Sequence, residues 1–274
     1  MANSILKKVF PTLEEIDIKR IHSKIGDKCN DFYFVEFLKA TKGNVDDAYR
    51  LFKFDEELRS FLLKYILRFE IQIKSDFMSC LIKATNNECF WEDENNYIFR
   101  SHDEYERLMQ KIRDAFANLN VITIHNDSYA VAYVISFGTF VSLFKYIKPE
   151  LKKGFVKKYT KKLFKKNDYQ LLNKYLLCIR ALRNRCAHGT HVVSNSFVNQ
   201  LNQYSTIKKE ENTGPGYEFY SVFELTLKYL IDMIYCTTEF KDRLMDLLQK
   251  RKTVYYKYGG RQSVNPSIVE KLNK

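Results

Sequence analysis

Apolar residues recur at intervals of three and four along most of this chain, the spacing that places them on one face of an α-helix. The chain has only nine Gly and four Pro in 274 residues, which leaves few residues for the many tight turns of a β-sandwich. The 21 Phe and 19 Tyr are enough to fill a core and still leave aromatic surface. The pattern therefore predicts an all-α, multi-helix bundle.

The longest periodic stretch begins at Asp55, which has the character of a helix cap and is followed by two glutamates that suit a first turn. A second set of apolar residues widens its stripe, so this helix is expected to be central. Upstream, residues 30–53 are expected to form one or two short helices with a break at Gly43 and Asn44. The main apolar positions of the long helix are Leu58, Leu62, Tyr65, Phe69, Ile73 and Phe77.

Within this helix Glu70 and Lys74 lie four residues apart, and Arg68 is near. One interpretation is an intrahelical ion pair of small energetic value. The other is that Glu70 or Arg68 faces a functional group on a later helix and orients it. Both interpretations stay open at this stage.

Further helices are predicted after the irregular, Trp-containing stretch 85–101, which is expected to be an ordered loop. They cover Tyr105–Asn118, Tyr129–Tyr146 and Ser221–Lys250. Gly138 lies in the middle of the second of these, where glycine costs about 1 kcal/mol relative to alanine. Close packing against a neighbouring helix is the preferred explanation for it.

Residues 151–166 read LKKGFVKKYTKKLFKK, with eight Lys and no acidic residue. Apolar side chains repeat every four positions, so one face is expected to pack and another to be cationic. A solvated lysine face is the simpler interpretation. The favoured one is a surface that binds RNA phosphates, because dense lysines without counter-charges repel one another until an anion arrives. The candidate RNA-binding residues are Lys153, Lys157, Lys158, Lys161, Lys162 and Lys165.

The most distinctive stretch is Leu176–His191, LLCIRALRNRCAHGTH, where an apolar helical run ends in a group of polar residues. Gly189 is typical of the position just past a last helical turn, and cations suit the carbonyl end of a helix. A plain helix terminus therefore explains much of the pattern. The functional interpretation is that Arg183 grips a phosphate in a bidentate way while His188 moves a proton near neutral pH.

Spacing alone does not make this site specific, since Arg185 and His191 also satisfy an Arg-x(4–6)-His pattern. On an ideal helix Asn184 lies on the same face as His188, whereas Arg183 lies about 140° around the axis. Arg183 must therefore reach around the helix, or the helix must loosen, or a partner group must come from another chain. His191 is a supporting candidate, and Cys186 is expected to be a packing residue.

The formal charge of +12 and the pI near 9.2 favour polyanionic partners, of which nucleic acid is the commonest. No apolar run is long enough to span a membrane, and the N-terminus lacks the apolar core of a secretory signal, so a cytoplasmic protein without membrane contact is expected. The six dispersed Cys have no paired CxxC spacing, which argues against a disulfide framework and a zinc site.

Three blocks of the sequence carry a family resemblance: FDEELRSFLLKYILRFEIQIKSDF at 54–77, SFGTFVSLF at 136–144 and the string LRNRCAH at 182–188. In this order, over about residues 50–195, they resemble the Abi family of bacterial abortive-infection proteins, the group that includes AbiD and AbiF. That family resembles the wider HEPN superfamily, whose Arg-x(4–6)-His signature marks metal-independent ribonucleases.

The resemblance implies an HEPN-like helical bundle that acts as an RNA-cleaving toxin in phage defence, with no metal or other cofactor. Arg183, Asn184 and His188 would be catalytic and Glu70 supporting, since the resembling families keep an acidic residue in that helix. Acid and base roles usually need two groups and the chain offers one confident Arg/His pair, which suggests a homodimer that brings two motifs together. An RNA antitoxin wrapped on the lysine surface would suit the AbiF-like branch. The alternative is a non-catalytic RNA-binding or interaction module whose motif is structural.

The expected organisation is one compact unit in three parts. Residues 1–50 form an N-terminal helical extension, and residues 51–195 form the HEPN-like core with the motif. Residues 196–274 contain a loop, a C-terminal helix and a basic, Tyr-rich tail that is expected either to bind RNA or to dock on the body.

Overall fold

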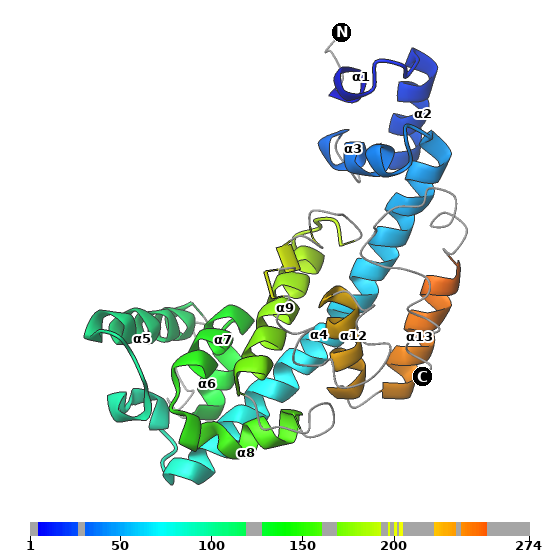
Figure 1. The fold of residues 1–274 in the computed structure, drawn as a ribbon. Coiled ribbons are helices and arrows are strands. Elements are labelled where there is room, and N and C mark those ends of the chain that lie inside the picture. Colours follow the sequence, from blue (N-terminus) through cyan, green and yellow to red (C-terminus); the bar gives the residue numbers. More distant parts are fainter. Residues whose placement is uncertain are drawn as a thin grey trace.

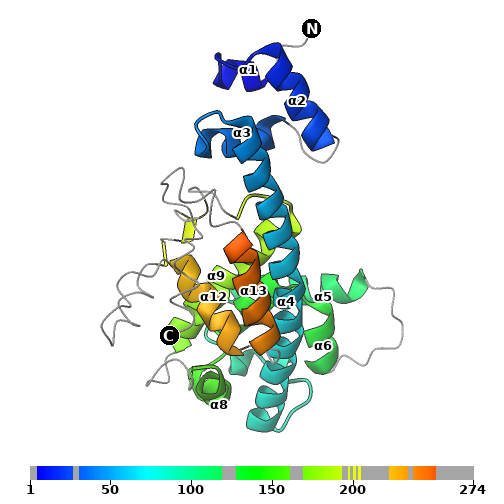
Figure 2. The ribbon, with the colours of Figure 1, turned by 90° about the vertical axis from the view of Figure 1, so that its right-hand side faces the viewer.

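A computed structural model of the chain gives the architecture (Figures 1 and 2). It describes residues 5–26, 31–118, 128–160, 169–192, 222–233 and 237–250, together with residues 197, 200, 201, 203 and 204. Within these ranges the regular elements are helices, and the only extended pairing is an isolated bridge between Tyr97 and Ile147. The predicted all-α fold class is confirmed.

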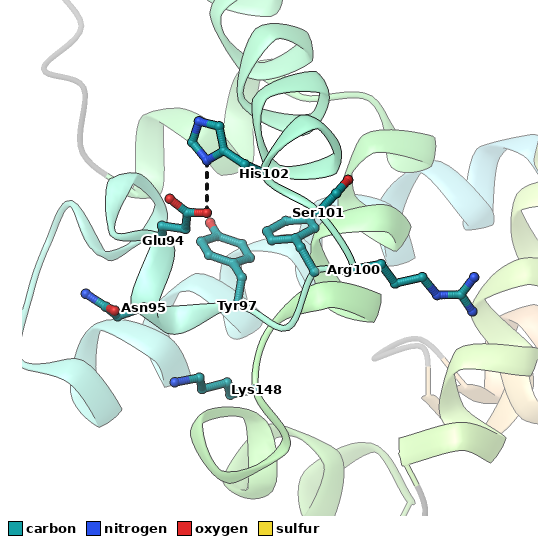
Figure 3. A pocket seen from close by; sticks show the side chains of 8 residues that line it. Glu94, Asn95, Tyr97, Arg100, Ser101, His102 and Lys148 are labelled. Carbon is teal, nitrogen blue, oxygen red and sulfur yellow. Dashed lines mark hydrogen bonds and ion pairs between the residues drawn. The ribbon is translucent and has the colours of Figure 1, made fainter.

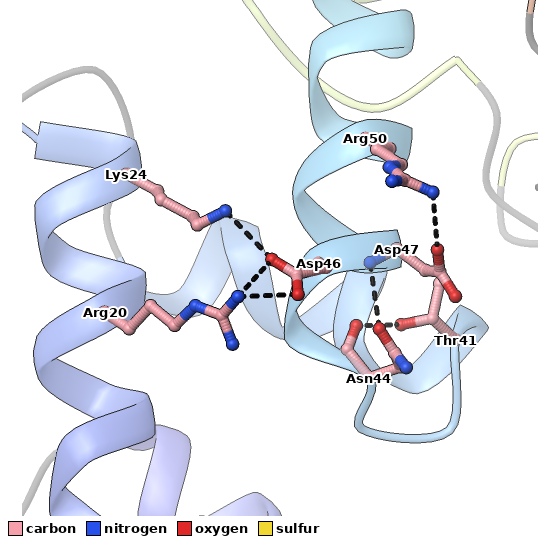
Figure 4. A network of polar contacts seen from close by, with 7 residues as sticks. All are labelled: Arg20, Lys24, Thr41, Asn44, Asp46, Asp47 and Arg50. Atoms are coloured by element: carbon pink, nitrogen blue, oxygen red, sulfur yellow. Dashed lines mark hydrogen bonds and ion pairs between the residues drawn. The ribbon is translucent and has the colours of Figure 1, made fainter.

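One long helix, α4 (Val45–Thr85), forms the axis of the molecule. Its first turn is capped by Asn44, whose side-chain Oδ1 accepts the N–H of Asp47 at 3.0 Å. Asp46 in the same turn binds Arg20 at 2.6 Å and Lys24 at 2.9 Å (Figure 4). The prediction that this helix begins at Asp55 was wrong, because the second helix expected after Gly43 and Asn44 runs without interruption into the long one.

Buried residues occur all around α4, since helices pack on several of its sides. Tyr65 donates its hydroxyl to Glu239 Oε1 at 3.0 Å, and the ring of Phe61 stacks on that of Phe240. Phe77 contacts the rings of Phe140, Phe144 and Phe155. The helices packed along α4 include α6 (Ser128–Val134), α8 (Pro149–Thr160), α9 (Tyr169–Ala187), α12 (Val222–Met233) and α13 (Thr237–Lys250).

Three helices gather at the N-terminal end of α4: α1 (Ile5–Val9), α2 (Glu15–Ile25) and α3 (Asp31–Ala40) (Figure 1). The chain turns from α3 into α4 at Gly43, which has φ +85°. The proposed boundary between residues 50 and 51 falls inside α4. The basic tail from residue 251 onward lies outside the described residues.

The expected loop 85–101 contains two 3-10 turns, η2 (Phe90–Glu92) and η3 (Glu94–Asn96). Trp91 and Tyr97 are buried there, and the Tyr97 hydroxyl donates to the Trp91 carbonyl at 2.7 Å. This loop is therefore ordered by its own side chains. It leads into α5 (His102–Ala117), close to the predicted bounds of that helix.

The helix predicted over Tyr129–Tyr146 is instead two helices, α6 and α7 (Phe137–Tyr146). Ser136 has an extended backbone, and its side chain caps α7 by accepting the N–H of Thr139. The Ile135 carbonyl accepts a hydrogen bond from the ammonium of Lys74 at 2.9 Å. Gly138 is thus in the first turn of α7 and not in mid-helix. A Cβ placed there would meet Ser136 at 3.6 Å and Arg180 at 3.8 Å, ordinary contact distances.

Lys152 differs from the other described lysines of its segment, because it is 1% exposed. Its ammonium donates to the Phe144 carbonyl at 2.6 Å and lies over the rings of Phe144 and Tyr169. It thereby joins α8 to the C-terminal end of α7, where a cation is favoured. Burial lowers the pKa of Lys152 to about 8, and the charge of Glu150 opposes this shift.

This pKa predicts a pH-dependent stability. In the unfolded chain Lys152 keeps its ordinary pKa, so between pH 8 and about pH 10 the unfolded state holds a proton that the folded state has lost. The free energy of unfolding should therefore rise over this interval by about 2 kcal/mol relative to the Lys152→Met variant. Urea denaturation of both proteins across this range measures the difference. A constant difference between them would contradict the buried position of Lys152.

Candidate functional site

The predicted motif lies at the C-terminal end of α9, on a helix whose inner face is fully packed. Tyr175 stacks on Tyr229 of α12 with ring centroids 4.5 Å apart, which fixes α9 against its neighbour. Leu182 and Cys186 continue the buried face to the last turn. Burial also raises the pKa of the Cys186 thiol to about 12, so this residue is a packing thiol and not a nucleophile.

Gly189 ends the helix as the sequence predicts. It has φ +68°, in the left-handed region, and the N–H of Thr190 reaches back to the Arg185 carbonyl at 3.0 Å. A Cβ at this position would also lie 3.5 Å from Nη1 of Arg59. That distance is an ordinary contact, so the backbone conformation is what favours glycine here.

Arg183 turns from α9 toward α4, where its Nε lies 3.5 Å from Oε2 of Glu70. The other oxygen of Glu70 is 3.3 Å from the ammonium of Lys74. The side chains of Glu70 and Lys74 are each 8% exposed and that of Arg183 is 29% exposed. Glu70 thus forms the intrahelical pair with Lys74 and also faces the motif arginine. Arg68 instead lies over the ring of Tyr65.

The contact between Arg183 and Glu70 is electrostatic. Neither the Nε of Arg183 nor Oε2 of Glu70 has a hydrogen-bond partner in the described part of the chain. Charge therefore draws the guanidinium toward the carboxylate without a directed bond. Such a contact orients Arg183 through its buried Nε, while the side chain as a whole stays 29% exposed.

Asn184 and His188 are exposed at the end of α9, where the backbone N–H of His188 donates to the Asn184 carbonyl at 2.9 Å. Within the described ranges no hydrogen bond joins the side chains of Arg183, Asn184 and His188 to one another. The structure therefore places one motif residue in a partly buried ion pair and two at the surface. Of the three ways in which Arg183 was expected to meet His188, loosening of the helix is not observed before Ala187.

The second Arg/His pair has a different environment. Arg185 donates to the His191 carbonyl at 3.0 Å and to Gln200 at 3.1 and 3.2 Å, and its guanidinium lies over the Phe197 ring. The His191 ring stacks on Tyr33, with centroids 3.8 Å apart, and meets the edge of Phe37. Burial lowers the pKa of His191, and this favours the neutral form of the imidazole. These two side chains fix the segment after the motif.

Asp55 holds the same segment and was missed as a site residue. Its buried carboxylate accepts the N–H of Val192 at 2.9 Å, Nε of Arg59 at 2.8 Å and the hydroxyl of Tyr33 at 3.2 Å. Asp55 lies on the apolar stripe of α4, three residues from both Phe52 and Leu58. Its spacing from these two apolar residues is a sign that Asp55 is buried. A helix cap followed by Glu56 and Glu57 in the first turn explains the same residues equally well.

The lysine surface is only partly described: Lys161, Lys162 and Lys165 lie outside the described residues. Lys153 and Lys157 are exposed on α8, and Lys158 binds Asp76 of α4 at 2.6 Å. The charge of Lys158 is therefore partly neutralised by Asp76, although its side chain remains 51% exposed. Figure 1 shows α8 beside the start of α9, whereas the motif is at the other end of this helix, about 28 Å away.

A separate surface hollow of about 380 Å³ lies between η3 and the start of α5 (Figure 3). His102 binds Glu94 there at 3.1 Å, and this carboxylate raises the pKa of the imidazole. Glu94 offsets the cations Arg100 and Lys148 of the same wall, so this hollow does not have the uniform charge that suits a phosphate.

The described ranges contain no group of three His, Cys, Asp or Glu side chains placed to hold a metal ion. None of their helices combines the length and the apolar character required to cross a bilayer.

The fold and the polar end of α9 define an all-α protein with an Arg-Asn-x-x-Ala-His motif on a helix supported by buried charges. Residues 29–194 match the family of Abi-like proteins, and the chain belongs to that family. This membership associates it with abortive infection, a form of phage defence. No curated protein and no solved structure matches the chain.

The Asp55 contacts predict that Asp55→Asn destabilises the protein by about 2 kcal/mol, because an amide cannot pair with Arg59 as a carboxylate does. Chemical denaturation measures this loss. Asp114→Asn is the matched control, since Asp114 is exposed on α5 and should tolerate the change. Equal stability of the two variants would show that Asp55 does not hold the segment after the motif.

Proposed function

We propose that this Abi-like protein is a cytoplasmic, metal-independent endoribonuclease of the HEPN type, an RNA-cleaving toxin of phage defence. The observation that supports this proposal is the position of Arg183, which the buried Glu70 orients at the same end of α9 as the exposed Asn184 and His188. A fixed cation and a proton-transfer group at one helix end are what cleavage of a phosphodiester requires.

In the proposed reaction the 2′-hydroxyl of a ribose attacks the adjacent phosphorus. The bond from phosphorus to the 5′-oxygen of the next nucleotide breaks, which leaves a 2′,3′-cyclic phosphate and a 5′-hydroxyl end. His188 removes the proton of the attacking hydroxyl or supplies one to the leaving oxygen. Arg183 stabilises the negative charge of the phosphorane, and Asn184 fixes the imidazole or the phosphate by hydrogen bonds.

Glu70 is a positioning residue in this proposal, because it faces Arg183 from α4 and lies below the surface. Lys74 binds the same carboxylate and anchors it to the turn between α6 and α7. His191 lies between the rings of Tyr33 and Phe37, so its support for the site is the ordering of the chain after Gly189.

Acid and base roles usually require two groups, and each chain supplies one exposed motif histidine. We therefore propose a homodimer with two-fold symmetry in which the two α9 ends share one active centre. Exposed Asn184 and His188 are compatible with such a contact. The lysines of α8, Lys153 and Lys157 among them, would bind RNA that extends away from the cleaved bond, or an RNA antitoxin that keeps the protein inactive.

A non-catalytic RNA-binding module is the second candidate. The observation that favours it is the ion pair of Arg183 with Glu70, because an arginine with a purely structural role makes the same contact between two helices. In that case the basic surface binds RNA while the end of α9 serves only to terminate the helix.

Cleavage of purified cellular RNA in EDTA distinguishes the two. We expect wild-type protein to cut RNA, and His188→Ala and Arg183→Ala to lose activity by about 100-fold or more. Glu70→Gln should lose less, since it acts through Arg183. His102→Ala is the matched control, an exposed histidine on α5 whose loss should leave cleavage unchanged. Intact RNA with the wild type, combined with salt-dependent binding, would support the module instead.

The dimer predicts a mass of twice 32.6 kDa in light scattering at micromolar concentration. The cleavage rate per chain should also fall on dilution, because the dimer dissociates and each chain loses the other half of the active centre. A monomer that keeps full activity would contradict the two-copy arrangement while leaving the nuclease itself intact.

A further inference from the structure

Arg180 lies on the same face of α9 as Asn184, one turn before the motif. Residues four apart on a helix are surface neighbours, with a rise of about 6 Å between them. That rise is comparable to the separation of successive phosphates in an extended strand. A nucleic-acid strand parallel to α9 would therefore present one phosphate to the motif and the next to Arg180.

In the part of the chain that the structure describes, no carboxylate pairs with Arg180. Three other arginines near this end of α9 have counter-charges or carbonyl partners: Arg59 binds Asp55, Arg183 faces Glu70, and Arg185 binds Gln200 and the His191 carbonyl. Within the described ranges Arg180 makes no hydrogen bond or ion pair, although it is partly buried. A partly desolvated guanidinium without an anion is expected to bind one strongly.

The side chain of Arg180 lies between α9 and α7. Its Cδ lies 3.8 Å from the place where a Cβ of Gly138 would be, so its stem runs across the first turn of α7. The N-terminal end of α7 contributes positive potential on that side. The stem of Arg180 therefore lies at the contact of α7 with α9, three residues before Arg183 and not among the lysines of α8.

We propose that Arg180 binds the RNA phosphate adjacent to the one cleaved, so that the substrate strand lies along α9 over its contact with α7. This assignment rests on the proposed nuclease function. It makes Arg180 a binding residue: it holds the strand in register with Arg183 and His188 and does not touch the reacting atoms.

The test uses a short RNA with 2′-O-methyl groups throughout, which lacks the attacking hydroxyl and is bound without being cut. Arg180→Gln should bind it about tenfold more weakly than wild type. The slope of log affinity against log salt should fall by about 0.7, the value for one contact with a single strand. Arg180→Lys should keep the slope. Arg113→Gln, which removes the same charge from exposed α5, should change neither quantity.

Cleavage kinetics separate binding from chemistry. With cleavable RNA, Arg180→Gln should raise KM about tenfold and leave kcat within about twofold. If the wild type binds the methylated RNA but cuts no RNA, the nuclease function fails while the loss of binding still tests Arg180. Where Arg180→Gln does not fold, Arg180→Met keeps the stem over Gly138 and removes the same charge. Unchanged affinity and salt slope, or an equal loss in Arg113→Gln, would overturn the assignment.

Discussion

The arrangement of the candidate site depends on one buried carboxylate, Glu70, which lies between two cations from different directions. Lys74 comes from the next turn of the same helix and also holds the Ile135 carbonyl, whereas Arg183 comes from α9. Removing one partner of a buried ion pair costs about 3 kcal/mol or more, because the remaining charge is left without compensation. The same contact that joins α4 to α9 therefore sets the direction in which the motif arginine points.

A second set of contacts fixes the segment immediately after the motif. Asp55 holds the N–H of Val192, Arg185 holds the His191 carbonyl, and the His191 ring is stacked on α3. The end of α9 is thus supported from α4 on one side and from α3 on the other. Such support is what keeps a catalytic group within the small range of positions that a reaction tolerates. It also supports the exposed Asn184 in the last turn of α9 and His188 directly after it.

The sequence predicted the elements whose evidence is local. Helical periodicity indicated the all-α fold, and the residue after the last apolar turn identified Gly189. Contacts between distant residues were not predictable in this way: Asp55 is 137 residues from Val192 and has the local appearance of a helix cap. At the break between α6 and α7, the Ile135 carbonyl accepts the ammonium of Lys74, 61 residues away. Lys152 is buried although Lys153 and Lys157 on the same helix are exposed. For Glu70, the spacing to Lys74 predicted one contact, and only the packing of α4 on α9 supplied the second.

The central claim is that the end of α9 cleaves RNA by attack of the ribose 2′-hydroxyl, with Arg183 on the phosphate. The most direct measurement is the chemistry of the new RNA ends formed by the wild-type protein in EDTA, compared with His188→Ala. We expect 2′,3′-cyclic phosphate and 5′-hydroxyl ends that are absent with the variant. Ends that carry a 5′-phosphate, or cleavage that survives the loss of His188, would contradict this claim.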